Sequence, residues 1–149
     1  MTDPGAVERI LGALAAAPGQ PLALGWATVE LERAAAELAA ELGISARAFL
    51  PASDSVVLGA LCRVAYGVLP DDRPLAILEP RTEGRLAGLL ARRGEGPAVT
   101  WTRPEDPTPG RRHGAAYPGP FGPERLSPDS PAHGPFALLI DAEPGTIDG

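Results

Sequence analysis

One carboxylate in this sequence stands where a strand could hold it for acid–base chemistry. Glu79 follows the apolar run Leu75–Leu78, and an apolar run that stops at Pro80 is typical of a buried strand. A carboxylate between apolar walls has its pKa raised by desolvation and can act as a general base. The alternative is structural, because Glu79 can pair with Arg81 or Arg85, or cap the turn before Pro80.

Two histidines and a tyrosine are the other candidates for proton transfer. His113, His133 and Tyr117 all lie in a segment rich in proline and glycine. The histidines could form a metal pair or supply an acid–base group, but their irregular neighbours give this no geometric support, so two loop histidines are the alternative. Cys62 lies in an apolar run without a histidine near it in sequence, so we expect a buried core residue rather than a nucleophile.

Aromatic side chains could line a binding site. Trp26 and Trp101 lie in two β-leaning runs, and if both point to one side they form an aromatic floor for a flat apolar ligand. If they point outward, they pack under helices. The alternation does not decide between these arrangements, because both faces of these runs are apolar. Tyr66 is a third candidate for ligand contact.

Composition excludes several classes of function. The net charge of −6 argues against a nucleic-acid partner, which requires a basic patch. No apolar run approaches the roughly 18 residues of a membrane span, and the first residues have no basic region typical of a secretory signal. A single cysteine provides no internal disulfide and suits a reducing compartment. We therefore expect a cytoplasmic protein that binds neither nucleic acid nor membrane.

The first hundred residues read as alternating helices and strands in one domain, residues 1–149. Apolar residues at helical spacing predict a helix over 5–17 and another over 31–42, with Gly43 at its end. β-leaning runs predict strands over 22–30, 46–50, 56–68 and from 75 onward, with turns at 51–55 and 70–74. A further helix begins near Thr82 and stops at Gly94, and a strand follows over 97–101.

The chain changes character after residue 102. Proline and glycine dominate residues 103–135, which therefore cannot form a long helix or a central strand. We expect either an irregular loop over the domain or a partly disordered segment; a loop of this length in a small domain is uncommon and often functional. A last strand is expected over 136–141, followed by a tail.

Two stretches resemble the vicinal oxygen chelate superfamily, which includes glyoxalase I, bleomycin-resistance proteins and methylmalonyl-CoA epimerase. Val29–Ala34 resembles the passage from the first strand into an acidic-led helix. Leu78-Glu79-Pro80, the next helix and Gly94-Glu95-Gly96 are similar to the epimerase branch. The resemblance covers residues 22–102. It implies an α+β fold of βαβββ modules with a curved mixed or antiparallel sheet, whose second module is truncated or irregular here.

The resemblance also implies a cup that usually holds a divalent metal on His, Gln and Glu side chains. This sequence departs from that pattern, since Ala23–Gly25 and Pro97-Ala98 stand where ligand histidines are expected. Alanine and proline side chains cannot coordinate a metal, so we expect no metal and no cofactor.

The leading prediction is metal-independent binding of a small organic molecule in the cup, with Trp26, Trp101 and Tyr66 as contacts. The first alternative is a lyase, isomerase or cyclase that uses Glu79 with His113 or Tyr117. The second is a structural or interaction subunit. A homodimer is possible in each case, because an incomplete second module leaves open sheet edges.

Overall fold

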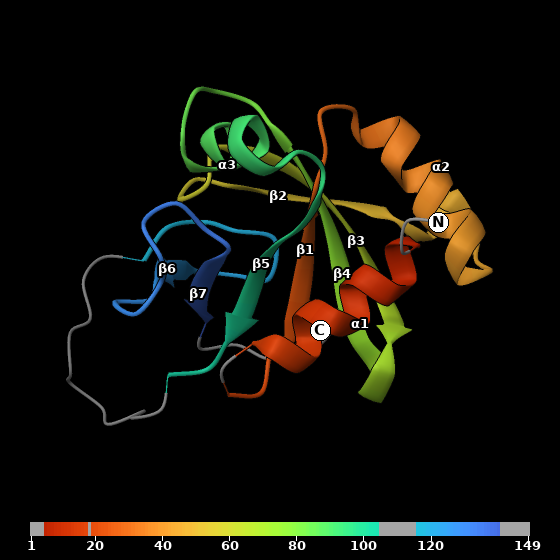
Figure 1. Cartoon of the computed structure of the whole chain (residues 1–149), viewed down its shortest axis with the longest axis horizontal. Helices are drawn as coiled ribbons and strands as arrows, with labels where there is room; N and C mark the ends of the chain where they lie inside the picture. Colours follow the sequence, from red (N-terminus) through yellow and green to blue (C-terminus); the bar gives the residue numbers. More distant parts are fainter. Residues whose placement is uncertain (1–4, 18, 105–115, 141–149) are drawn as a thin grey trace.

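The computed structural model describes residues 5–17, 19–104 and 116–140. Helices, strands and short 3-10 turns alternate along the chain (Figure 1). The α-helices are α1 (Ala6–Ala16), α2 (Leu31–Leu42) and α3 (Arg85–Arg93), and the 3-10 turns are η1 (Ala46–Ala48) and η2 (Pro70–Asp72). The strands are β1 (Ala23–Ala27), β2 (Leu50–Ser55), β3 (Ala60–Leu69), β4 (Arg73–Pro80), β5 (Gly96–Thr102), β6 (Glu124–Leu126) and β7 (Phe136–Ile140). The expected α+β class is confirmed.

The strands form one curled, mixed sheet in the order β2-β3-β4-β1-β5-β7-β6. β1 runs parallel to β4, and β3 runs antiparallel to β4. The same arrangement recurs in the second half, where β5 runs parallel to β7 and β6 antiparallel to β7. β1 and β5 meet in antiparallel orientation at the centre. The chain therefore builds one pairing pattern twice, as the expected modules require.

The second module is shorter than the first. In the first, α2 and β2 lie between β1 and β3. In the second, the described residues before β6 form two isolated β-bridges, and the one between Tyr117 and Glu124 lies at the place that a fourth strand would take. The segment 103–135 was expected to be irregular throughout, but it contains β6. A short ladder with β7 forms there because the three residues of β6, centred on Arg125, include no proline.

The hairpin before β4 differs from the sequence-based prediction. Residues 51–55, expected to form a turn, belong to the edge strand β2, while 46–48 form a 3-10 turn instead of a strand. Gly59 has φ +69 and its N–H donates to the carbonyl of Ser55 at 2.9 Å, so the turn closes there. Pro51 is tolerated in β2 because an edge strand leaves one row of backbone groups without a ladder partner.

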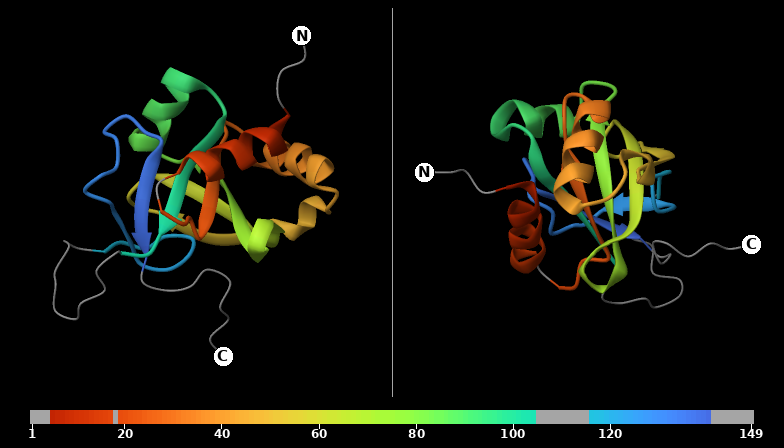
Figure 2. Two further views of the ribbon diagram at one scale, coloured as in Figure 1. Left: turned by 60° about the horizontal axis from the view of Figure 1, so that its bottom comes forward. Right: turned by 90° about the vertical axis from the view of Figure 1, so that its right-hand side faces the viewer.

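Two apolar clusters lie on opposite faces of the sheet, whose strands and covering helices Figure 2 shows from two further sides. The outer cluster joins α1 and α2 to one face, through residues that include Ile10, Leu24, Trp26, Leu38 and Ile77. The inner cluster joins α3 and the segment before β6 to the other face, through residues that include Ala23, Leu78, Leu89, Trp101, Phe121 and Leu138. Side chains alternate between the clusters along β1 and β4, as a pleated strand requires. Among the described residues, the structure contains no helix long and apolar enough to cross a membrane.

Candidate functional site

The inner cluster holds a buried carboxylate at its centre. Glu124 lies at the start of β6, and its side chain is fully shielded from solvent. Oε1 accepts a hydrogen bond from Trp101 Nε1 at 3.0 Å, and Oε2 accepts one from the hydroxyl of Ser55 at 2.7 Å. Burial raises the pKa of Glu124, and the two hydrogen bonds oppose that rise without cancelling it. The inner face of the sheet therefore contains a carboxyl group that releases its proton less readily than an exposed glutamate does.

The hydrogen bonds of Glu124 also close the sheet on itself. Ser55 ends β2 at one edge, whereas Glu124 belongs to β6 at the other. A backbone bond of 3.1 Å from Val56 to the carbonyl of Pro118 joins the same two edges. Because opposite edges meet over the inner cluster, this face is the concave one, and we call it the cup. The edges of the cup are thus connected directly, without a partner chain.

An aromatic ring from the chain itself occupies the cup. Phe121 projects from the segment before β6, and its ring meets the ring of Trp101 edge to face, with centroids 4.9 Å apart and planes at 79°. Both side chains are buried, Phe121 at 7% exposure and Trp101 at 0%. Small residues on β1 leave room for them. A Cβ at Gly25 would lie 2.7 Å from a methyl carbon of Leu78 and 3.0 Å from the Trp101 ring.

Cys62 is part of the same cluster. Its thiol is 5% exposed, and burial raises its pKa to about 12, which leaves it protonated near neutral pH. The expectation of a buried, unreactive cysteine therefore agrees with this environment.

The described side chains of the cup do not form a site for a divalent metal. The side chains of β1 and β5 that face it include Ala23, Ala27, Val99 and Trp101, and none of them can coordinate a metal. Both oxygens of Glu124 already accept hydrogen bonds. The described residues contain no group of three or more His, Cys, Asp or Glu side chains that could hold a metal ion. We therefore derive no chemistry through a metal.

Glu79 lies on the other face of the sheet. Leu78 before it belongs to the inner cluster, so the Glu79 side chain points away from the cup. Its Oε1 accepts the backbone N–H of Leu31 at 2.8 Å, which caps the first turn of α2. This geometry contradicts the expected general base in the cup. It is also not an ion pair with Arg81 or Arg85, because Arg81 binds Asp54 at 2.5 Å and Arg85 donates to the carbonyl of Val57 at 3.0 Å.

A second carboxylate completes this helix cap. Glu95 Oε2 accepts from the hydroxyl of Thr28 at 2.7 Å, from the N–H of Val29 at 2.9 Å and from Arg33 at 2.6 Å. Burial alone would raise the pKa of Glu95, but these hydrogen bonds outweigh it and hold the pKa below its usual range. Negative charge at a helix N-terminus is stabilising, so both carboxylates have a structural role.

The aromatic candidates do not share one site. Trp101 faces the cup, whereas Trp26 belongs to the outer cluster under α1 and α2. The aromatic floor expected from both rings is therefore absent, because the regular alternation along β1 turns Ala27 toward the cup and Trp26 away from it. Tyr66 and Tyr117 are about half exposed, at 47% and 48%.

Of the two histidines, the structure describes His133 alone. His133 is exposed in the loop before β7. His113 lies outside the described residues.

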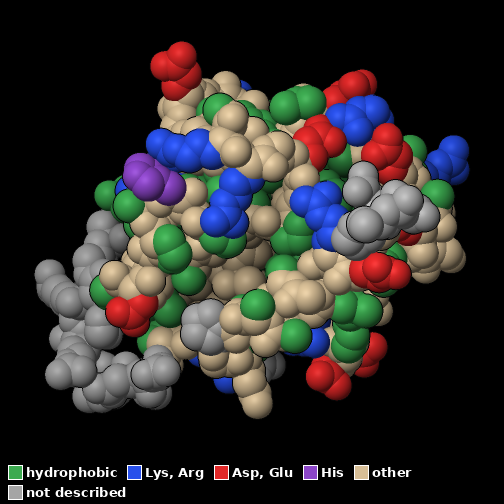
Figure 3. Space-filling view, in the orientation of Figure 1, with side chains coloured by type: hydrophobic (Ala, Val, Ile, Leu, Met, Phe, Trp, Pro, Cys, Tyr) green, Lys and Arg blue, Asp and Glu red, His purple; other side chains and the backbone are tan. Residues whose placement is uncertain are grey.

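On the face seen in Figure 3, acidic and basic side chains are mixed on the side of α2.

Sequence reasoning missed the residues at the centre of the cup. Glu124 stands between Pro123 and Arg125 in a segment without apolar alternation, and Ser55 was assigned to a turn. No local pattern marks either of them, because they meet only when the two edges of the sheet close.

Comparisons of the whole structure place this geometry among known folds. No protein-family model matches the sequence, and no curated protein does either. Methylmalonyl-CoA epimerase from Mycobacterium tuberculosis superposes with a TM-score of 0.60 at 17% identity, over 83% of this chain and 87% of that one. An engineered Streptomyces coelicolor methylmalonyl-CoA epimerase in complex with 2-nitronate-propionyl-CoA gives 0.57 at 19% identity, over 83% and 96%. The chain has the vicinal oxygen chelate fold.

A third solved structure supports the same assignment. A methylmalonyl-CoA epimerase in complex with methylmalonyl-CoA and an ammonium ion matches with a TM-score of 0.55 at 19% identity, over 78% of this chain and 90% of that one. At identities this low, the structural similarity establishes the vicinal oxygen chelate fold alone. The chemistry of this chain must be argued from its own residues.

Proposed function

We propose that this protein binds a small, flat apolar molecule in the cup, without a metal ion, in the space that the Phe121 ring fills. One observation carries the proposal: the cup of a ligand-binding fold is lined by small and apolar side chains, and a single ring from a loop occupies it. That ring supports an aromatic group as the ligand, because such a group can meet Trp101 edge to face in the same way.

We infer that a ligand can displace the Phe121 ring from the cup. It lies between Pro120 and Gly122, outside the seven strands, whereas Trp101 is fixed within β5. Its segment is held to the first module by the backbone bond from Val56 to Pro118 and to β6 by the pair of 2.8 Å bonds between Tyr117 and Glu124. A ligand that replaces the ring must overcome the cost of moving this segment, which lowers its apparent affinity.

The test compares wild-type protein with Phe121→Ala in titrations with indole, naphthalene derivatives and phenylpropanoid acids. Removal of a buried ring leaves an apolar cavity, and such cavities bind small aromatic molecules. We expect quenching or a shift of Trp101 fluorescence, with about tenfold tighter binding in Phe121→Ala because no ring must be displaced. Trp26→Phe is the matched control, since it removes the tryptophan outside the cup. A folded Phe121→Ala protein that binds no compound of the panel would overturn the proposal.

Elemental analysis tests the metal-independent part. We expect the purified protein to bind the same ligands after dialysis against a chelator. One stoichiometric zinc or manganese ion that is required for binding would contradict it.

A second candidate function is acid–base catalysis by an isomerase or lyase, and Glu124 favours it. A buried carboxyl with a raised pKa is a common general acid. The related structures suggest methylmalonyl-CoA as the first compound to test. Exchange of its α-proton with deuterium, followed by NMR, would support catalysis if wild-type protein accelerates it and Glu124→Gln does not. Absence of exchange in both proteins removes this candidate.

Self-association stays a prediction. β2 is an edge strand with an exposed Leu50, so it offers an apolar side chain and backbone groups to a second copy. Light scattering during size-exclusion chromatography would distinguish a dimer from a monomer. A stable complex recovered by pull-down would instead support the interaction subunit.

A further inference from the structure

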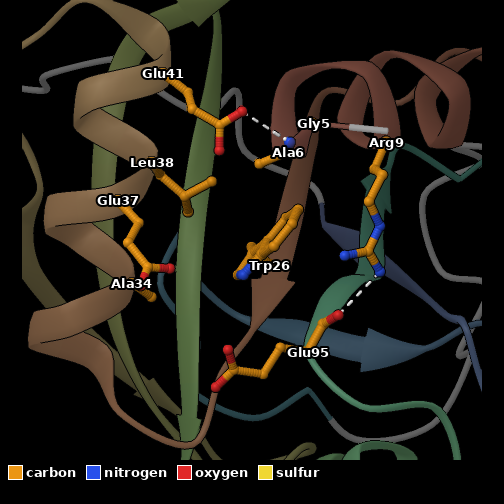
Figure 4. Close-up of a pocket in the computed structure, with 9 residues that line it drawn as sticks. All are labelled: Gly5, Ala6, Arg9, Trp26, Ala34, Glu37, Leu38, Glu41 and Glu95. Carbon is orange, nitrogen blue, oxygen red and sulfur yellow. Dashed lines mark hydrogen bonds between the residues drawn. The ribbon is translucent and has the colours of Figure 1, made fainter. Parts of the chain in front are cut away.

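A second pocket lies outside the cup, on the opposite face of the sheet. It has a volume of about 300 Å³ and opens between α1 and α2 over the middle of β1 (Figure 4). That volume is at the lower end of the range for small-molecule sites. None of its lining residues belongs to the inner cluster, so it is separate from the cup.

The wall formed by α1 contributes a guanidinium group that is held in place. Arg9 lies over the ring of Trp26, with its Cζ 5.1 Å from the ring centroid, and donates one hydrogen bond of 2.9 Å to the carbonyl of Glu95. A Cβ at Gly96 would collide with the guanidinium nitrogens, so the absence of a side chain there permits this position. Within the described part of the chain, no carboxylate forms an ion pair with Arg9.

The wall formed by α2 carries the opposite charge. Glu37 and Glu41 project from successive turns of that helix toward the pocket (Figure 4). Glu41 accepts the N–H of Ala6 at 2.9 Å and so ties α1 to α2. Both oxygens of Glu37 accept long hydrogen bonds of 3.4 Å from Arg33, and the Glu37 side chain remains 61% exposed. Glu37 is therefore the carboxylate of this wall that a ligand can reach.

The floor between the two walls is apolar. Trp26, Ala34 and Leu38 form it, and the Trp26 side chain is 7% exposed. The pocket thus presents a cationic group on one side, a carboxylate on the other and an aromatic surface between them. This arrangement matches a molecule that carries both charges on a short carbon chain.

We propose that this pocket binds a small zwitterion that carries a carboxylate and an ammonium group, such as an amino acid. Its carboxylate accepts hydrogen bonds from the free N–H groups of Arg9, and its ammonium group donates to Glu37. The hydrocarbon part lies on Trp26 and Leu38. The site does not depend on occupation of the cup, because the two lie on opposite faces of the sheet.

Calorimetry and Trp26 fluorescence with L-leucine, L-phenylalanine and 6-aminohexanoate test the proposal. Their methyl esters lack the carboxylate, and their N-acetyl derivatives lack the ammonium group. We expect each derivative to bind about tenfold or more weakly than its parent, since each loses one charge-assisted contact. The proposal would be overturned if the zwitterions show no binding at 10 mM (roughly the weakest affinity of interest). It would also be overturned if the esters and N-acetyl derivatives bind as well as their parents.

Variants of Arg9 and Glu37 test which residue binds each charged group of the ligand. Arg9→Gln should weaken binding of the zwitterion about tenfold and leave the weak binding of its ester unchanged. Glu37→Gln should weaken binding of the zwitterion about tenfold and leave the weak binding of its N-acetyl derivative unchanged. Arg93→Gln and Glu8→Gln make the same charge changes on exposed helix positions outside the pocket and should have no effect. An equal loss in the control variants would show a general effect of net charge and would reject this site.

Discussion

The hydroxyl of Ser55 donates a 2.7 Å hydrogen bond to Glu124, and this bond joins the two opposite edges of the sheet. Ser55 ends β2 of the first module and Glu124 begins β6 of the second. The hydroxyl oxygen of Ser55 also accepts the N–H of Leu58 at 3.2 Å, so the same residue orders the turn into β3. Closure of the cup and formation of the neighbouring hairpin are therefore linked.

Loss of the Glu124 carboxyl should destabilise the fold. Glu124→Ala leaves the Trp101 N–H and the O–H proton of Ser55 without an acceptor in a dry environment, and it also leaves a cavity. We expect a loss of about 2–4 kcal/mol in the free energy of unfolding, measured by urea denaturation. Glu124→Gln retains an acceptor for Trp101 and should lose about 1 kcal/mol or less at pH 4. Equal losses for the two variants would show that hydrogen bonding at this position contributes little.

Glu124 should also make stability depend on pH. Because its pKa is raised in the folded state, its contribution is fully present below the unfolded pKa of about 4.3 and is lost as pH rises through the folded pKa. The unfolding free energy of wild type relative to Glu124→Gln should therefore fall from pH 4 toward neutral. Glu95 has a lowered pKa, so Glu95→Gln should show the opposite sign, with a contribution lost as pH falls. A pH-independent difference between wild type and Glu124→Gln would contradict the burial argument.

Two glycines offer a matched test of how tightly the cup is packed. Gly25→Ala places a methyl group within 2.7 Å of Leu78, so we expect a loss of about 1–3 kcal/mol from overpacking. Gly12→Ala lies in α1 with no atom within 4 Å of the new methyl group, and should gain about 0.5–1 kcal/mol from helix propensity. Thermal denaturation of both variants checks the two signs. If Gly25→Ala leaves the stability unchanged, the cup can expand around the added methyl group.

The reactivity of Cys62 should report opening of the cup. With a pKa of about 12, the buried thiol reacts slowly with a disulfide reagent at pH 8 in the folded protein. Phe121→Ala should accelerate the reaction, because the ring that covers the inner cluster is gone. Absorbance of the released thiolate measures both rates, and protein in denaturant gives the upper limit. Rapid labelling of folded wild type would contradict the closed cup.

Local patterns were sufficient for the first module. Helical spacing located α2 and α3 close to their observed bounds, because each has one apolar face and a glycine at its end. The hairpin between β2 and β3 was placed too early, since Pro51 and Asp54 resembled a turn although an edge strand accommodates them. β6 was missed because a three-residue strand forms only against its partner β7.

The sequence by itself therefore determined the order of elements in the first module, the apolar character of Cys62 and the loss of histidines where metal ligands are expected. The tertiary structure decided which face each strand presents to the cup, because both faces of β1 and β5 are apolar and only packing against the helices selects between them; Trp26 and Trp101 lie on opposite faces. It also decided the partners of three carboxylates: Glu79 and Glu95 cap α2, and Glu124 closes the sheet. These contacts join residues 48 to 69 positions apart, and at such separation the local pattern of neither partner carries information about the other.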